Sequence, residues 1–140
     1  MAKLLSPLRL LAAAVVAALA LTGCSPSDSA IEKALSDASA EINKTCPETV
    51  DEETRLDSTS TAPGKILQYN YTLVNIAKAD LTDQQLKDFE AALKPEILTA
   101  LKDNPAMKSL KDYQVTFKYS YKSSDAQDLF TLTITPADYA

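Results

Sequence analysis

The sequence predicts an α+β fold: a four-stranded antiparallel sheet with helices packed on one face, in the order α-β-β-α-β-β. Three observations support this prediction. Two segments space their apolar residues three or four apart, as one face of a helix requires. Other segments alternate apolar and polar residues, as half-buried strands do, and the last two of these are joined by a short polar connection typical of a hairpin. Because hairpins and helices occur in separate blocks, we expect antiparallel pairing.

The first helix is predicted over residues 30–44. Ser29 followed three residues later by Glu32 matches a capping box, which satisfies backbone donors at a helix start. The apolar residues of the segment recur at intervals of four, three and four and so share one face. They are Ile31, Leu35, Ala38 and Ile42.

Residues 47–60 combine alternation with dense charge, which favours an edge strand because charged edges resist unwanted pairing. The Ser/Thr-rich residues 58–64 predict a loop, with Pro63 and Gly64 suited to the centre of a turn. A strand with one apolar face follows over residues 67–73. Its apolar positions are Leu67, Tyr69, Tyr71 and Leu73.

A second capping box, Thr82 with Gln85, opens the longest helical segment. Pro95 lies inside it and predicts a kink or break near Lys94, because proline lacks a backbone donor. The helix is expected to end at Asn104. After it, residues 115–122 and 130–135 alternate apolar and polar side chains and predict a hairpin. The helical stripe consists of Leu86, Phe89, Leu93, Ile97 and Leu101.

The first 24 residues differ in composition from the rest. Lys3 and Arg9 give a positive start, and residues 10–21 form an apolar run too short to span a ~30 Å hydrocarbon core as a helix. The run ends in Leu21-Thr22-Gly23-Cys24. This ending resembles the lipobox of bacterial lipoproteins, in which Leu21, Thr22 and Gly23 would be recognised by the signal peptidase and Cys24 would be lipidated.

The lipobox resemblance implies a signal peptide (1–23), a lipidated cysteine with a short tether (24–28) and a single α+β domain (29–140). The chain would contact the membrane of the bacterial cell envelope through its lipid anchor. Lipoproteins kept at the inner membrane of Gram-negative bacteria carry Asp after the cysteine, whereas Ser25 follows it here. We therefore expect the outer membrane, facing the periplasm, in a Gram-negative source, and the outer face of the single membrane in a Gram-positive one.

The composition argues against several classes of chemistry. The chain has no His, no Trp, two Cys and two Gly, so it lacks histidine-based nucleophile pairs, histidine-ligated metal sites and the Gly-rich loops that cradle phosphates. We expect no enzymatic activity, no cofactor and no metal. The formal net charge is −5, and removing residues 1–23 takes away two basic residues and no acidic one. We therefore expect no nucleic-acid partner.

One charged segment is a candidate partner surface: Asp51, Glu52, Arg55 and Asp57 lie close together in the predicted edge strand. Carboxylates can bind Ca²⁺, but this spacing is not that of a calcium loop and no glycine permits the sharp turn such loops need. A solvated charged strand with Arg55 paired internally explains the same residues. Both interpretations stay open at this point.

Four tyrosines and one cysteine also have more than one interpretation. Two Tyr-x-Tyr pairs, Tyr69 with Tyr71 and Tyr119 with Tyr121, form either a core layer beneath the helices or an aromatic platform for a partner. Cys46 is the remaining cysteine once Cys24 is lipidated. It is a small buried residue, half of an intermolecular disulfide, or a reactive thiol.

The segments Cys46-Pro47, Val50-Asp51, 54–58 and 69–74 resemble a group of small uncharacterised exported bacterial proteins. The leading functional hypothesis is a non-enzymatic, lipid-anchored protein that binds another envelope protein, as an assembly factor, pilotin-like accessory or inhibitor. The alternative is a lipoprotein that binds a small apolar ligand in a groove between the helices and the sheet.

Overall fold

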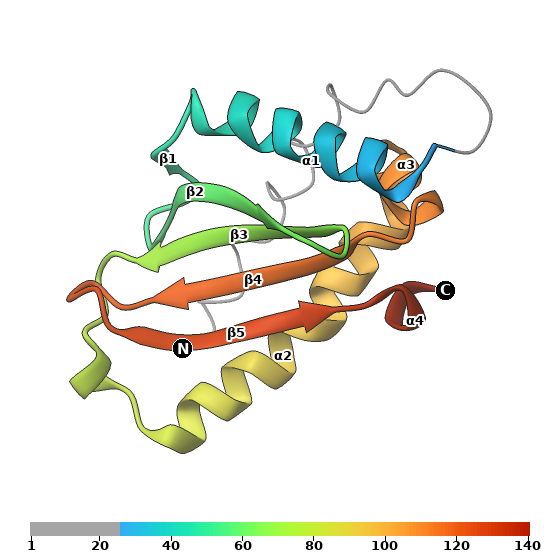
Figure 1. The fold of residues 1–140 in the computed structure, drawn as a ribbon. Helices are drawn as coiled ribbons and strands as arrows, with labels where there is room; N and C mark the ends of the chain where they lie inside the picture. Colours follow the sequence, from blue (N-terminus) through green and yellow to red (C-terminus); the bar gives the residue numbers. More distant parts are fainter. Residues whose placement is uncertain (1–25) are drawn as a thin grey trace.

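The computed structural model describes residues 26–140, which form a five-stranded mixed sheet with helices on one face (Figure 1). The strands lie side by side in chain order, and neighbours are antiparallel except β3 and β4, which are parallel. The elements are α1 (Asp28–Asn43), β1 (Glu48–Thr49), β2 (Thr54–Ala62), β3 (Ile66–Leu73), η3 (Lys78–Asp80), α2 (Asp83–Asp103), η4 (Pro105–Met107), α3 (Lys108–Asp112), β4 (Thr116–Lys122), β5 (Asp128–Ile134) and α4 (Pro136–Tyr139).

The α+β class is confirmed, but the predicted four-stranded antiparallel sheet is wrong. A fifth strand arises because the predicted edge strand folds back on itself. Asp51 Oδ1 accepts hydrogen bonds from the backbone N–H groups of Glu53 (2.7 Å) and Thr54 (2.8 Å), and this turn separates β1 from β2. The loop predicted at residues 58–64 is largely strand. Thr59 is buried there and its hydroxyl lies 2.7 Å from that of Ser39 in α1.

The prediction of antiparallel pairing is wrong for β3 and β4, at the centre of the sheet. The reason is that one long helix, α2, connects the two hairpins. α2 has 21 residues and spans about 31 Å, slightly more than the ~26 Å of the eight-residue β3. It therefore returns the chain to the end of the sheet at which β3 begins. Ile66 consequently pairs with Thr116 and Thr72 with Lys122, in parallel. A helix of this length acts as a crossover connection between parallel strands.

The start of α1 differs from its prediction. Ser27 rather than Ser29 caps the helix, accepting a hydrogen bond from the backbone N–H of Ala30 (3.2 Å). Glu32, expected to complete a capping box with Ser29, instead accepts a hydrogen bond from the backbone N–H of Gly64 (2.7 Å). Gly64 has φ 93° and lies in the turn predicted between β2 and β3. The Glu32 carboxylate thus ties α1 to that turn.

The boundaries of α2 agree with the sequence. Thr82 and Gln85 form the predicted capping box, with hydrogen bonds of 2.9 and 3.1 Å. The helix ends at Asp103 and Asn104 is its C-cap, which agrees with the expected end. It continues unbroken through Pro95, so of the predicted kink or break the break is absent, and the kink stays a prediction. Pro95 is exposed on the side of the helix that faces away from the core.

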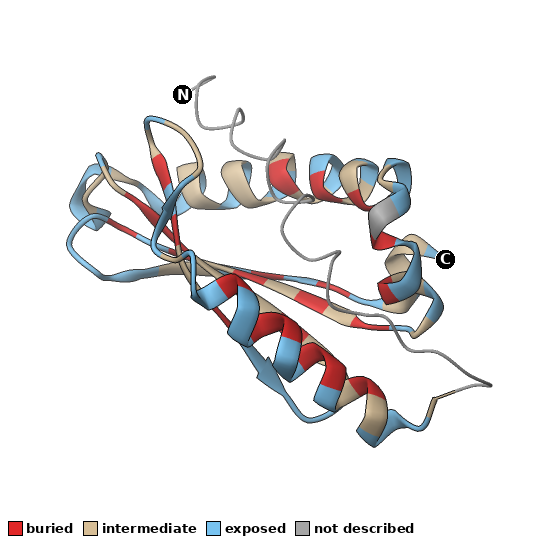
Figure 2. Cartoon of the chain, turned by 90° about the horizontal axis from the view of Figure 1, so that it is seen from above, coloured by how far each residue is buried: buried red, intermediate tan, exposed pale blue. Residues whose placement is uncertain are grey.

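The core lies between the inner face of the sheet and the helices α1 and α2, and Figure 2 shows buried residues on the strands and on the helix sides that face them. The four paired tyrosines are at most 2% exposed and form its central layer. Tyr69 stacks on Tyr119 across β3 and β4, with ring centroids 5.3 Å apart, and Tyr71 stacks on Tyr121 at 5.1 Å. The tyrosines are therefore core residues, and the interpretation as an exposed platform is wrong.

Removing a tyrosine hydroxyl should have opposite effects at two positions. The Tyr71 hydroxyl is buried and has no hydrogen-bond partner within residues 26–140, whereas the Tyr139 hydroxyl donates to the carbonyl of Val115 at 2.7 Å. An unpaired buried polar group costs roughly 1–3 kcal/mol. Tyr71→Phe should therefore leave the free energy of unfolding unchanged or raise it by up to ~1 kcal/mol. Tyr139→Phe should lower it by ~0.5–1.5 kcal/mol. Denaturant unfolding measures both, and a clear loss of stability in Tyr71→Phe would contradict the geometry.

Stability should fall at alkaline pH. Burial raises the pKa of all four core tyrosines well above the ordinary value near 10, and it raises the pKa of Tyr139 to about 12. Above about pH 10 these residues ionise in the unfolded chain but stay protonated in the folded one, so the unfolded state binds fewer protons. The contribution of these tyrosines to the free energy of unfolding is therefore fully present below about pH 10, and it is lost as the pH rises beyond that value.

Circular dichroism and tyrosinate absorbance measured together from neutral to strongly alkaline pH check this dependence. The absorbance of the core tyrosines should appear in the same transition as the loss of secondary structure. Tyr119→Phe should weaken the pH dependence because it removes one titrating group. Ionisation of these tyrosines in a chain that keeps its secondary structure would refute their assignment to the buried core.

Candidate functional site: a groove between α2 and β5

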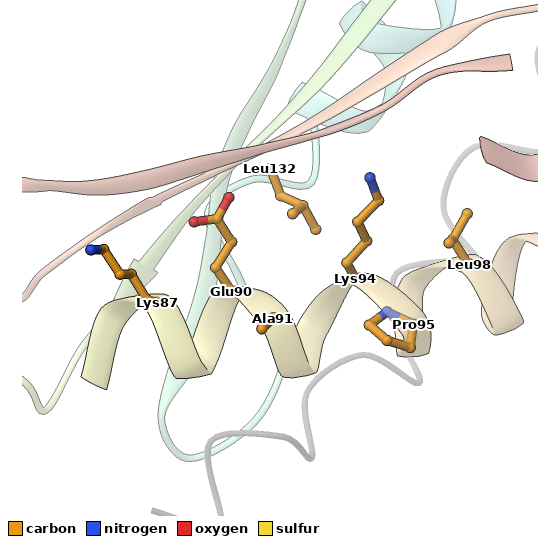
Figure 3. A pocket seen from close by; sticks show the side chains of 7 residues that line it. All are labelled: Lys87, Glu90, Ala91, Lys94, Pro95, Leu98 and Leu132. Atoms are coloured by element: carbon orange, nitrogen blue, oxygen red, sulfur yellow. The ribbon is translucent and has the colours of Figure 1, made fainter. Parts of the chain in front are cut away.

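A groove of about 540 Å³ runs between α2 and β5 (Figure 3). Most of its lining comes from one flank of α2, and one side chain from β5 completes it. Apolar side chains make up the floor, and charged side chains stand along it and point towards the strand in Figure 3. The lining residues are Lys87, Glu90, Ala91, Lys94, Pro95, Leu98 and Leu132.

The position of the groove follows from the periodicity of α2. Leu93, Ile97 and Leu101 are buried against the sheet. At 3.6 residues per turn, Ala91 and Leu98 fall about 100–120° from the centre of that stripe, on one flank. β5 is the last strand of the sheet among the described residues, so no strand in that part of the chain covers this flank. Figure 1 shows the first half of α2 projecting past β5.

The charges along the groove are only partly neutralised within the described chain. Lys94 Nζ lies 3.3 Å from Asp138 Oδ1 and so links α2 to α4. Hydrogen bonds from Thr135, together with Lys94, hold the pKa of Asp138 below its usual value, so this carboxylate is ionised at neutral pH. Lys87 and Glu90 form no ion pair with any residue of 26–140. An apolar floor beside unpaired charges is suited to bind an amphipathic segment.

Within the described part of the chain, no group of three Asp, Glu or Cys side chains converges as a metal site would require. None of the helices in residues 26–140 combines the length and the apolar character needed to cross a bilayer.

The four residues of the predicted partner surface, Asp51, Glu52, Arg55 and Asp57, lie in the β1–β2 turn and in β2. Arg55 Nε lies 2.6 Å from Asp57 Oδ1, and Thr72 donates a hydrogen bond to the same carboxylate. The Asp51 carboxylate accepts backbone hydrogen bonds in the turn between β1 and β2, and Glu52 is exposed next to it. Arg55 is thus paired within the chain, as one of the two interpretations expected. Binding of a partner by these four residues stays a prediction.

Cys46 is half-buried, has a free thiol and packs against the edge of the core after α1. Burial, followed by the carboxylates of Glu48 and Asp57, raises the pKa of the thiol. A raised pKa keeps the sulfur protonated, and the thiol is a much weaker nucleophile than the thiolate. This environment favours the interpretation as a small packing residue over a reactive thiol.

The lipobox, Leu21, Thr22, Gly23 and Cys24, lies outside the described residues, as does the whole predicted signal peptide, and lipidation stays a prediction. The sequence predicted a groove between helices and sheet only as an alternative, and none of its residues was identified. The sequence feature that could have identified the groove is the position of three residues, Ala91, Pro95 and Leu98, outside the main apolar stripe of α2.

A family model for a domain of unknown function, DUF8479, matches residues 29–130. The chain belongs to the DUF8479 family. No curated protein matches it in sequence.

Three solved structures with the same fold come from bacterial proteins. A Pseudomonas aeruginosa protein described as secreted superposes with a TM-score of 0.67 at 13% identity, covering 84% of this chain and 100% of its own. The pilotin EpsS of the Vibrio vulnificus type 2 secretion system gives 0.60 at 12%, covering 81% and 94%. The type II secretion pilotin AspS of Vibrio cholerae gives 0.55 at 11%, covering 79% and 94%. At these identities the likeness establishes the fold alone.

Proposed function

We propose that this DUF8479 protein is a lipid-anchored, non-enzymatic accessory protein of the bacterial envelope that binds a segment of another protein in the groove between α2 and β5. The observation that carries the proposal is the apolar floor of the groove, which is open to solvent and lies beside Lys87 and Glu90, two charges that have no ion-pair partner within residues 26–140.

The shape of the groove supports a protein segment over a small molecule. Lys87 and Leu98 at its two ends are eleven residues apart in α2, which corresponds to about 16 Å along the helix axis. Small-molecule sites bury roughly 70–90% of the ligand surface, which an open groove on the side of one helix does not achieve. A compact apolar ligand is therefore the weaker candidate.

The structural neighbours support an accessory role in the envelope. Two of them are pilotins of type 2 secretion systems, and a third is described as secreted. The DUF8479 chain shares their layered α+β fold, in which helices pack on one face of a sheet. We extend to this chain only the general role, an exported protein that assists another envelope protein.

The lipobox and the start of α1 determine how the domain would sit at the membrane. α1 begins at Asp28, four residues after Cys24. A fully extended chain of four residues spans about 14 Å, so the α1 end of the domain would lie close to the bilayer surface. In a Gram-negative source this surface would be the periplasmic face of the outer membrane.

The two cysteines provide a matched test of anchoring. Cys24→Ala should abolish incorporation of labelled palmitate and release the protein from the membrane fraction, because Cys24 is the residue that would carry the lipid. Cys46→Ala should leave label and membrane fraction unchanged, because Cys46 only packs against the core edge. Metabolic labelling with cell fractionation measures both variants. Persistence of label and membrane association in Cys24→Ala would overturn the anchor.

Two exposed alanines provide a matched test of the groove. Ala91 lies in the groove on α2, and Ala40 lies on the solvent side of α1. A photoreactive amino acid at Ala91 of the full chain, irradiated in intact cells, should form a covalent adduct with one identifiable envelope protein, at a yield about tenfold above the same probe at Ala40. Both sites are exposed helix positions, so folding should be equally unaffected. Equal labelling from both positions, or none from Ala91, would overturn the proposed function.

A further inference from the structure

The strand that borders the groove is an open edge. β5 pairs with β4 on one side, and no strand within residues 26–140 pairs with its other side. Residues 129–134 contain no charged residue and no proline, the side chains that usually protect an edge strand from pairing. Apart from Asp128 at its start, β5 is an unprotected strand of apolar residues and threonines.

The opposite edge is covered at Arg55, Leu56 and Thr59 of β2. β1 pairs with Arg55 and Leu56 at one end of β2. Farther along β2, the Asn43 side chain of α1 accepts a hydrogen bond from the Thr59 N–H (2.6 Å) and donates one to the Thr59 carbonyl (2.9 Å). These are the two backbone groups that a neighbouring strand would pair. The amide of Asn43 therefore takes the place of a strand at this position.

The helix beneath β5 extends beyond the sheet. A helix is about 10 Å wide, and neighbouring strands lie about 4.8 Å apart. α2 makes its main strand contact with β5, and its groove-lining flank continues outside that strand. A sixth strand beside β5 would lie above this flank, and its inward side chains would reach the apolar floor of the groove.

We propose that the partner segment in the groove binds as an extended strand that adds to the open edge of β5. This inference rests on the proposed function and specifies how the same site recognises its partner. Backbone hydrogen bonds to β5 would supply affinity, and the groove would select side chains at every second position. Five extended residues span about 16 Å, which matches both Phe130–Ile134 of β5 and the length of the groove.

The chemistry of the groove defines the segment. Ala91, Leu98 and Leu132 require apolar side chains at alternate positions. Lys87 has no ion-pair partner within residues 26–140, so a carboxylate at the end of the segment that faces the start of α2 would form an ion pair with it. The occupant is therefore an extended segment of another envelope protein with alternating apolar residues and an acidic residue at one end.

The test uses a photoreactive amino acid at four positions of the full, membrane-anchored chain. Ala91 probes the groove beneath an added strand. Thr133 probes the outer face of β5, which an added strand reaches with its other set of side chains. Ser60, an exposed hydroxyl residue on the outer face of β2, is the control for Thr133, and Ala40 is the control for Ala91.

The expected result is that Ala91 and Thr133 capture the same segment of the same protein, at least about tenfold above Ser60 and Ala40. Mass spectrometry should place the two adducts an odd number of residues apart in that segment, because successive side chains of a strand point to opposite faces. If the probe at Ala91 alone gave adducts at partner positions three or four residues apart, the segment in the groove would be a helix. That outcome overturns the added strand and leaves the proposed function intact, whereas no capture from Ala91 overturns both.

Capture of a second copy of this chain from Thr133 would make the edge a self-association site and would also overturn the proposal. Hydrogen exchange provides an independent measurement on the isolated complex and the free protein. Amides of residues 128–134 should exchange on the order of tenfold more slowly in the complex, since an added strand takes up backbone groups that face solvent in free β5. Unchanged exchange in this segment, with a partner bound at Ala91, contradicts an added strand.

Discussion

The stacking of tyrosines across the parallel pair β3 and β4 is the constraint on which the rest of the structure depends. Tyr69 lies against Tyr119 and Tyr71 against Tyr121, in the same register as the backbone pairing. Because side chains alternate between faces, a slip of one residue in either strand would move its tyrosines to the polar face. Stacked pairs add about 0.5–1.5 kcal/mol each beyond their burial, so the register is strongly specified.

This parallel register determines where α2 can lie. The connection from β3 to β4 must return to the end of the sheet at which β3 begins, so the chain needs one long helix rather than a tight turn. α1 already packs on β2 and β3, and α2 packs under β5, at the far edge of the same face. Its outer flank then has no strand above it within the described residues, and the groove follows from this arrangement.

The local features of the fold were predictable because short-range physics determines them. Alternation at Tyr69 and Tyr71 predicts a strand, and the Thr82–Gln85 capping box predicts a helix start, whatever the neighbours are. The direction of β4 relative to β3 was not predicted, because pairing partners distant in sequence leave no mark in local periodicity. The groove was missed for the same reason: Ala91 and Leu98 form a floor only because α2 lies at an edge. Glu32, expected to cap its own helix, instead accepts a hydrogen bond from the backbone N–H of Gly64, 32 residues away.

The unequal treatment of the two sheet edges is the feature that most needs a functional explanation. Stability and solubility favour covering both edges, and the chain covers part of one of them with β1 and with the side chain of Asn43. A lysine in place of Thr131 or Thr133 would protect the other edge, since both positions are exposed and face solvent. Instead β5 combines high strand propensity, no charge after Asp128 and an apolar groove directly beside it. An added strand, as proposed, would cover the unprotected edge and the uncovered helix flank together, and so it explains why both occur at one place on the surface.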